Sequence, residues 1–322
     1  MNSKQAETNP NNRKRLILAA LSYLVSGLLI AWIISRFDFS LFKQVLDKSD
    51  PALLALAACL ILLVPFFTAC RWLGVVRAQS KEHIPYTLAL RACMAANVMN
   101  SFLPSKAGDM AKVIYVRKRL GLVSGIGTVI VERMSDLFMM GILGLIGYFY
   151  SGKSSGLIVG VLLLAFVLGI FLTAFFIPFE KLPLPSSIQN ALKSIRSVAV
   201  KWISSPANVL LTTGGALGTW ILMGSTLCTL EAAIAANPQP GATLAAYPVA
   251  VLAGMLPVTV SGIGTRDAAF VALLSSHMLI EEAGFIALSY TVLAYWFIAA
   301  VSTPFVLNEI RRFIKLPRDT NQ

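Results

Sequence analysis

Residues 100–109 read NSFLPSKAGD and interrupt a long apolar stretch of the chain. They follow the apolar run 86–98 and lead into residues 110–115. Non-helical backbone at membrane depth is tolerated only where protein or a water-filled cavity covers it. Ionisable side chains at that depth are costly and usually functional. We therefore expect this first break, residues 100–109, to be a functional turn within a membrane protein.

A second stretch, residues 256–267, reads LPVTVSGIGTRD and contains a similar set of residue types. Both stretches contain Leu-Pro followed by small residues, glycine and a base, and both end in Asp. We expect this second break, residues 256–267, to be the counterpart of the first, with the remaining chain as a scaffold around the two.

The composition indicates a protein embedded in a membrane. Of the 322 residues, 57% are hydrophobic and 13% charged, and the mean hydropathy is +0.74. Soluble domains are about 45–50% apolar and about 25% charged. The net charge of +12 does not indicate nucleic acid binding, because most bases lie in short loops between apolar runs, as the positive-inside rule describes. Four cysteines lie in apolar segments without metal-ligand spacing and are expected to pack: Cys59, Cys70, Cys93 and Cys228.

Several apolar runs approach or exceed the roughly 20 residues that a membrane span requires. The expected spans are residues 16–35, 52–72, 122–150, 156–177, 210–236 and 283–307. Residues 36–50 are expected to form a mixed-charge loop. Residues 186–203 carry apolar side chains at helical spacing opposite bases, which indicates a helix on the membrane surface or, alternatively, a solvated connector.

The positions of the bases suggest a topology. With the N-terminus in the cytoplasm and both breaks folded as re-entrant hairpins, 18 of the 27 bases are cytoplasmic, 4 are outside and 5 lie within the membrane. This assignment places Arg71 in a cytoplasmic loop with Arg77 and Lys81. Three crossings in each half then invert the second half, so the hairpins enter from opposite faces and their tips meet near the midplane, as in transporters with inverted repeats.

The resulting fold class is an all-α polytopic membrane protein with about six full spans plus two re-entrant helical hairpins in an inverted repeat. We expect a disordered cytoplasmic tail over 1–12, one membrane domain over 13–312 with halves 13–153 and 156–312, and a second cytoplasmic tail over 313–322.

Each break carries residues suited to an anion. Lys106, Asp109 and Lys112 open a short helix after the first break. At the second, Gly262 and Gly264 would let a ligand approach the backbone, Thr265 is the expected N-cap, and a helix begins near Arg266. Free N–H groups at a helix start favour phosphate or another anion. The alternative is that the glycines only allow close helix packing.

Glu132, Arg133 and Asp136 lie on one helix within the apolar segment 122–150. Two carboxylates in a dry site require neutralising bases, for which Lys106, Lys112 and Arg266 are candidates. One interpretation is a buried ion-pair network that locks the hairpins. The other is a polar cavity in which a carboxylate takes up a proton during transport.

In order along the chain, residues 100–109, Gly121, residues 132–136 (ERMSD) and residues 257–267 resemble the lysylphosphatidylglycerol synthase transmembrane-region family, also called flippase-like domain proteins. The resemblance covers roughly residues 13–312. This family usually has Glu where this chain has Asp109 and Asp267, so the charge is kept and the reach is shortened. Some family members carry a soluble aminoacyl-transferase domain, for which this sequence has no counterpart, so no synthase activity is implied.

The resemblance implies a bacterial or archaeal membrane protein that moves or helps to process an anionic or polyprenyl-linked lipid. We expect a lipid translocase in the bacterial cytoplasmic membrane, with no catalytic residues, cofactor or metal and with both termini cytoplasmic. The alternatives are an integral-membrane enzyme and a lipid-presenting partner of a glycosyltransferase. The expected lipid-binding residues are Asn100, Lys106, Asp109, Lys112, Glu132, Arg133, Asp136, Gly262, Gly264, Arg266 and Asp267.

Overall fold

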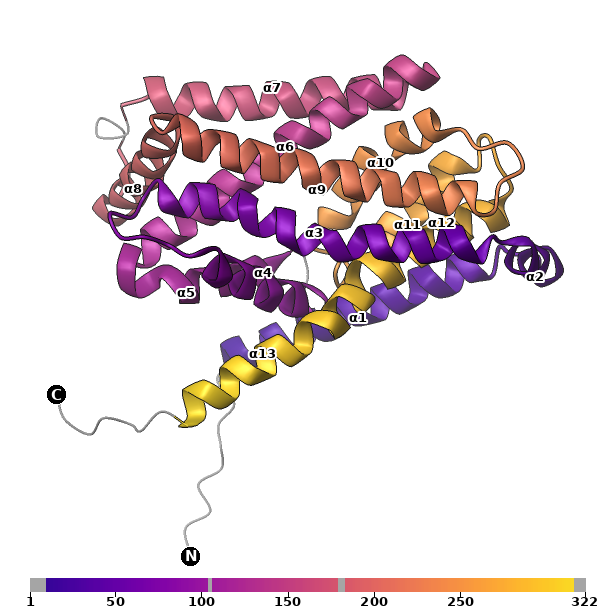
Figure 1. Ribbon diagram of the computed structural model, residues 1–322, viewed down its shortest axis with the longest axis horizontal. Coiled ribbons are helices and arrows are strands. Elements are labelled where there is room, and N and C mark those ends of the chain that lie inside the picture. Colours follow the sequence, from indigo (N-terminus) through magenta and orange to yellow (C-terminus); the bar gives the residue numbers. More distant parts are fainter. Residues whose placement is uncertain (1–9, 104–105, 179–182, 316–322) are drawn as a thin grey trace, which may run out of the picture.

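A computed structural model describes residues 10–103, 106–178 and 183–315 of the chain, and the described part is helical throughout, without strands (Figure 1). The helices run mostly along the long axis of an elongated bundle. Helix α1 begins at Pro10, so the predicted tail over 1–12 is too long by three residues; residues 1–9 lie outside the described part. Helix α13 likewise continues to Lys315, into the predicted C-terminal tail.

Six long helical segments correspond to the six predicted spans. They are α1 (Pro10–Ile34), α3 (Pro51–Arg77), α6 (Leu122–Ser151), α7 (Ser154–Phe176), α9 (Pro206–Ala232) and the continuous segment α12 (Ile280–Thr291), the π-helix η3 (Val292–Phe297) and α13 (Ile298–Lys315). In the described part, three helices are long and apolar enough to cross a membrane: α3, α7 and residues Ile280–Asn308. A bent pair, Ala20–Ile34 with Phe39–Lys48, makes a fourth if it is one span. The number of six full spans stays a prediction.

In each half, one short amphipathic helix precedes the second long helix. Helix α2 (Phe39–Lys48) occupies residues that the sequence analysis assigned to a loop. Its N-cap is Asp38, whose carboxylate accepts hydrogen bonds from the backbone N–H groups of Ser40 and Leu41. Helix α8 (Ser186–Ile203) covers the predicted surface helix. The two helices lie at opposite ends of the molecule (Figure 1).

Each break joins two short helices that pack against each other. The first hairpin consists of α4 (Tyr86–Asn100), the turn, the 3₁₀-helix η1 (Ala107–Met110) and α5 (Ala111–Leu120). The second consists of α10 (Pro240–Met255), the turn and α11 (Thr265–Leu274). Both turns contain a non-glycine residue in the left-handed region, Lys106 at φ 54° and Ser261 at φ 56°. That backbone conformation is uncommon outside glycine and is strained, so the two turns share a conformation as well as a sequence pattern.

The two turns touch. The Ser261 hydroxyl donates a hydrogen bond to the backbone carbonyl of Asn100, which links the second break to the first across 161 residues of sequence. This hydrogen bond confirms the expectation that the two turns contact each other. Re-entry of the hairpins from opposite membrane faces stays a prediction.

The helix contacts are reciprocal between the two halves. Each half has the order long helix, amphipathic helix, long helix, hairpin, long helix. Helices α3 and α9, which hold equivalent places, pack along each other. The first hairpin helix of each half packs on the last long helix of the other, α4 on α13 and α10 on α6. The amphipathic helices do the same, α2 on α12 and α8 on α6. This exchange of partners is expected of two halves related by a two-fold axis, and inversion of the second half stays a prediction.

Close approach of α3 and α9 depends on glycine. A Cβ atom at Gly215 would lie 2.4 Å from the backbone nitrogen of Arg71 and 2.7 Å from the carbonyl oxygen of Phe67. These are backbone atoms, which side-chain rotation cannot move away. Glycine at this position therefore allows the backbones of α3 and α9 to approach each other closely beside Arg71.

We predict that Gly215→Ala destabilises the protein by about 1–3 kcal/mol, the usual effect of overpacking a core, measured as a lower thermal unfolding midpoint in detergent. The adjacent Gly214→Ala is the matched control, because a Cβ there meets nothing within 4 Å. It should be neutral or slightly stabilising, since alanine has the higher helix propensity. Equal midpoints for the two variants would contradict the packing of α3 on α9.

Candidate functional site

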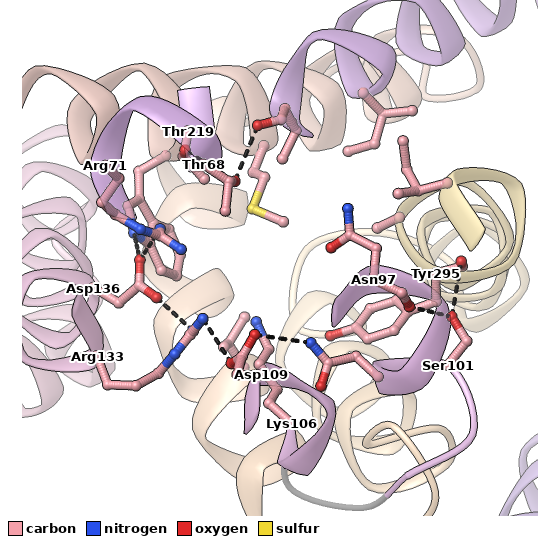
Figure 2. Close-up of a pocket in the computed structure, with 18 of the residues that line it drawn as sticks. Thr68, Arg71, Asn97, Ser101, Lys106, Asp109, Arg133, Asp136, Thr219 and Tyr295 are labelled. Carbon is pink, nitrogen blue, oxygen red and sulfur yellow. Dashed lines mark hydrogen bonds and ion pairs between the residues drawn. The ribbon is translucent and has the colours of Figure 1, made fainter. Parts of the chain in front are cut away.

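A cavity lies between the hairpins and the long helices, near the middle of the long helices. Four of the long helices each contribute a residue from the middle of their length to the cavity wall. These residues are Val64 of α3, Asp136 of α6, Thr219 of α9 and Ala294 of the segment Ile280–Asn308. The volume is about 80 Å³, enough for several water molecules. Figure 2 shows charged side chains along one side of it and Asn97, Ser101 and Tyr295 along the other.

Six ionisable side chains in and behind the wall form the charge cluster, which comprises Arg71, Asp109, Lys112, Glu132, Arg133 and Asp136. At its centre, Arg71 of α3 is 3% exposed. Arg71 donates from Nε and Nη2 to Glu132 Oε1, at 3.1 and 2.9 Å, and from Nη1 to Asp136. The prediction that Arg71 lies in a cytoplasmic loop is wrong, because α3 continues for six residues beyond it.

The first hairpin supplies Asp109 and Lys112. Lys112 is 1% exposed, and its ammonium lies 2.8 Å from Glu132 Oε2 and 3.4 Å from Asp109 Oδ1. Arg133 bridges Asp109 Oδ2 at 2.7 Å and Asp136 Oδ2 at 2.5 Å. The Asn100 amide donates to Asp109 Oδ1 at 3.1 Å. The cluster thus connects α3, η1, α5 and α6, as the chain of dashed lines in Figure 2 shows in part.

Within the cluster, three bases face three acids, so its net charge is zero. Burying a charge away from water is costly unless a partner and hydrogen bonds compensate it. Every member has an oppositely charged partner within 4.0 Å, and the Trp220 indole adds a hydrogen bond to Asp136 Oδ1 at 3.2 Å. An ion-pair network, one of the two interpretations of these residues, is therefore present. Of its three expected bases only Lys112 takes part, because Arg266 pairs with Asp267 and Lys106 forms no ion pair within the described residues. Arg71 and Arg133 supply the other positive charges.

The second hairpin holds a separate buried pair. Arg266, 1% exposed, lies 3.4 Å from Asp267 Oδ1 and donates to the Thr291 hydroxyl, which in turn donates to Asp267 Oδ1 at 2.6 Å. Asp267 Oδ2 also accepts from the backbone N–H of Gly264 at 2.9 Å. Gly264 is the N-cap of α11 and Thr265 is its first residue, so the prediction of Thr265 as N-cap is wrong.

Three tyrosines stand between this pair and the cavity. Tyr247, Tyr290 and Tyr295 line the cavity, whereas Arg266 and Asp267 do not. The Arg266 guanidinium carbon lies 4.2 Å from the ring centre of Tyr295 and 5.6 Å from that of Tyr290, in cation–π contact. Tyr295 belongs to the π-helix η3, a rare wide turn that is frequent at functional sites. The tyrosine wall, defined by these three residues, covers Arg266.

The predicted site residues fall into three groups. Six of them line the cavity: Asn100, Lys106, Asp109, Lys112, Arg133 and Asp136. Glu132 is buried behind them, and Arg266 with Asp267 lies behind the tyrosine wall. A Cβ at Gly262 would lie 2.6 Å from the Gly254 Cα, and one at Gly264 would lie 2.8 Å from the Leu29 Cβ. Both glycines therefore allow close packing of the second break on α10 and α1, which was the alternative interpretation of these residues.

Several cavity residues were not predicted, among them Arg71, Asn97, Thr219, Trp220 and the three tyrosines. A signal for Arg71 was available, since the apolar residues 72–76 continue beyond it and a base flanked by apolar runs on both sides indicates burial. Nothing in their local sequence distinguishes the aromatic residues from others in apolar helices.

These observations define an all-helical membrane protein with two contacting hairpins and a charged cavity between them. Residues 19–302 match the family described as "Lysylphosphatidylglycerol synthase TM region", and the chain belongs to this family. The family match indicates a multi-pass membrane domain with a lipid-related function. A comparison with curated proteins finds none that matches the sequence.

We predict that Arg71→Met destabilises the protein by about 3–5 kcal/mol, because it leaves Glu132 and Asp136 buried with fewer positive partners. Thermal unfolding in detergent measures the change. The double variant Arg71→Met with Glu132→Gln should recover part of the loss, since it removes a charge of each sign. Arg117→Met at the exposed end of α5 serves as control, and an equal effect there would exclude a specific role for Arg71.

Proposed function

We propose that this chain is a lipid translocase that moves an anionic phospholipid or a polyprenyl-phosphate-linked lipid across the bacterial cytoplasmic membrane. The observation that carries the proposal is the charged cavity at half the length of the long helices, between two hairpins that touch at their turns. A binding site near the midplane at the junction of two repeats is the arrangement through which transporters give each face access in turn.

The chemistry of the cavity wall supports a polar, negatively charged headgroup as the cargo. Lys106, Lys112, Arg71 and Arg133 line the cavity together with the amide of Asn97 and the hydroxyl of Thr219. Charge-assisted hydrogen bonds from such bases bind phosphate well. The lipid tails would remain in the bilayer, because the outer faces of the helices are apolar, with exposed side chains such as Leu162 and Phe166 on α7.

The proposal includes both termini in the cytoplasm and no chemical change to the lipid. An integral-membrane enzyme or a lipid-presenting partner of a glycosyltransferase are the competing functions. A headgroup-modified product formed by the purified protein would favour the enzyme. Binding of lipid without transbilayer movement would favour the presenting partner. An adjacent gene for a lipid-sugar transferase would favour both the translocase and the presenting partner over the enzyme.

We expect Lys106→Gln to lower the rate of transbilayer lipid movement at least about tenfold, the effect of losing roughly 1.4 kcal/mol of binding to the headgroup. The wild-type and Lys106→Gln proteins are each reconstituted in vesicles that contain fluorescently labelled phosphatidylglycerol. A reductant added outside the vesicles quenches the label in the outer leaflet and so reports the fraction of lipid that has crossed from the inner leaflet. A pH gradient is applied in each direction.

The matched control is Lys118→Gln, which removes the same charge at an exposed position at the end of α5 and should leave the rate unchanged. Thermal midpoints of both variants confirm that they are folded. A Lys106→Gln protein that is folded and transports as fast as the wild type would exclude this cavity as the path of the headgroup.

A further inference from the structure

Lys106 differs from the other bases around the cavity. Within residues 20–103, 106–178 and 183–308, whose side chains are described, no carboxylate lies within 4.0 Å of its ammonium. Arg71, Lys112 and Arg133 all have such partners. Figure 2 places Lys106 beside Asp109 at the edge of the cavity.

The bases around the cavity outnumber the acids. Four bases line it, namely Lys106 and the three bases of the charge cluster. Three acids balance them, Asp109 and Asp136 in the wall and Glu132 directly behind it. The pair Arg266 and Asp267, behind the tyrosine wall, adds one charge of each sign. The described residues of the site thus carry one positive charge in excess.

The excess charge belongs to a residue at the start of a closely packed segment. Lys106 adopts φ 54° and ψ 30° and is the N-cap of η1. Helix η1 packs on α4. A Cβ at Gly108 would lie 2.4 Å from the backbone nitrogen of Asn100, so glycine at this position allows η1 to approach the end of α4 closely. Lys106 therefore lines the cavity from the start of a segment that packs closely on α4.

A partly buried excess charge favours a ligand that neutralises it, since an uncompensated charge in a low-dielectric site is costly. A ligand with no net charge leaves the excess in place. A ligand with two or more negative charges replaces it by an excess of the opposite sign. Only a ligand with a single negative charge brings the site to zero.

We propose that the headgroup bound in this cavity carries one negative charge, as a phosphodiester does, and that Lys106 is the residue that sets this charge. The inference rests on the proposed function and specifies its substrate class. It excludes diphosphate-linked lipids, and it excludes phosphomonoesters, which carry about −1.5 to −2 at neutral pH. Two kinds of lipid have the required chemistry, a phospholipid with an uncharged polar headgroup and a polyprenyl monophosphate sugar.

Binding of soluble short-chain lipids to the purified full-length protein tests the charge. The probes are dihexanoyl phosphatidylglycerol and a short polyprenyl monophosphate sugar, each with one negative charge, dihexanoyl phosphatidylcholine with no net charge, and geranyl diphosphate with two or more. At least one monoanionic probe should bind about tenfold more tightly than both other classes. The stronger of the two monoanionic probes identifies the lipid class.

Two variants test the role of Lys106 in selectivity. Lys106→Gln should remove the preference for the monoanion over phosphatidylcholine, whereas the exposed Lys118→Gln should keep it. Asn97→Lys adds a base to the cavity wall and should shift the preference toward geranyl diphosphate. A residue that only stabilises the turn would change all affinities together and would leave their ratio as it is.

The outcomes separate this inference from the proposed function. Equal binding of the diphosphate and monoanionic probes by a protein that moves lipid would overturn the charge assignment alone. Absence of binding by every probe, together with absence of lipid movement in vesicles, would overturn both. A selectivity ratio that is the same in the wild type and in Lys106→Gln would overturn the assignment to Lys106.

Discussion

The arrangement of this protein depends on the need to neutralise charge that is buried inside a helical bundle. Glu132 and Asp136 are buried in the central part of α6, where an ionised carboxylate is costly unless it is paired. Arg71 from α3 and Lys112 from α5 supply the compensating charge, and Asp109 and Arg133 complete the network. Because these residues come from different elements, their pairing fixes the first hairpin against the long helices.

The second hairpin is stabilised by a smaller version of the same principle. Arg266 is neutralised by Asp267, covered by Tyr295 and Tyr290, and tied to α12 through Thr291. The first hairpin therefore exposes part of its charge to the cavity, whereas the second keeps its charge sealed. The two halves share an order of elements and a left-handed residue in each turn, and they differ in which charges reach the cavity.

Local chemistry made much of this predictable. Polar residues and glycine within apolar runs located both breaks, and apolar length located the six long helices. Helix α2 was missed because its mixed charge resembles a loop, although Asp38 followed by an amphipathic stretch was a usable signal. The pairing of Arg71 and the tyrosine wall could not be predicted, since they depend on how α3, α10 and α12 meet residues far away in sequence.

The π-helix has a consequence for the last long segment. Its wide turn accommodates an extra residue, so α13 is rotated relative to α12 by the roughly 100° that one residue represents in an α-helix. Helix α12 packs on α2, α9 and α11, whereas α13 packs on α4. The rotation lets one continuous helical segment contact both sets of neighbours. The same offset turns Tyr295 onto the Arg266 guanidinium while its carbonyl accepts from Ser101 of the opposite half. The π-helix thus contacts both hairpins through one residue, and rewinding of this turn into an α-helix would break both contacts.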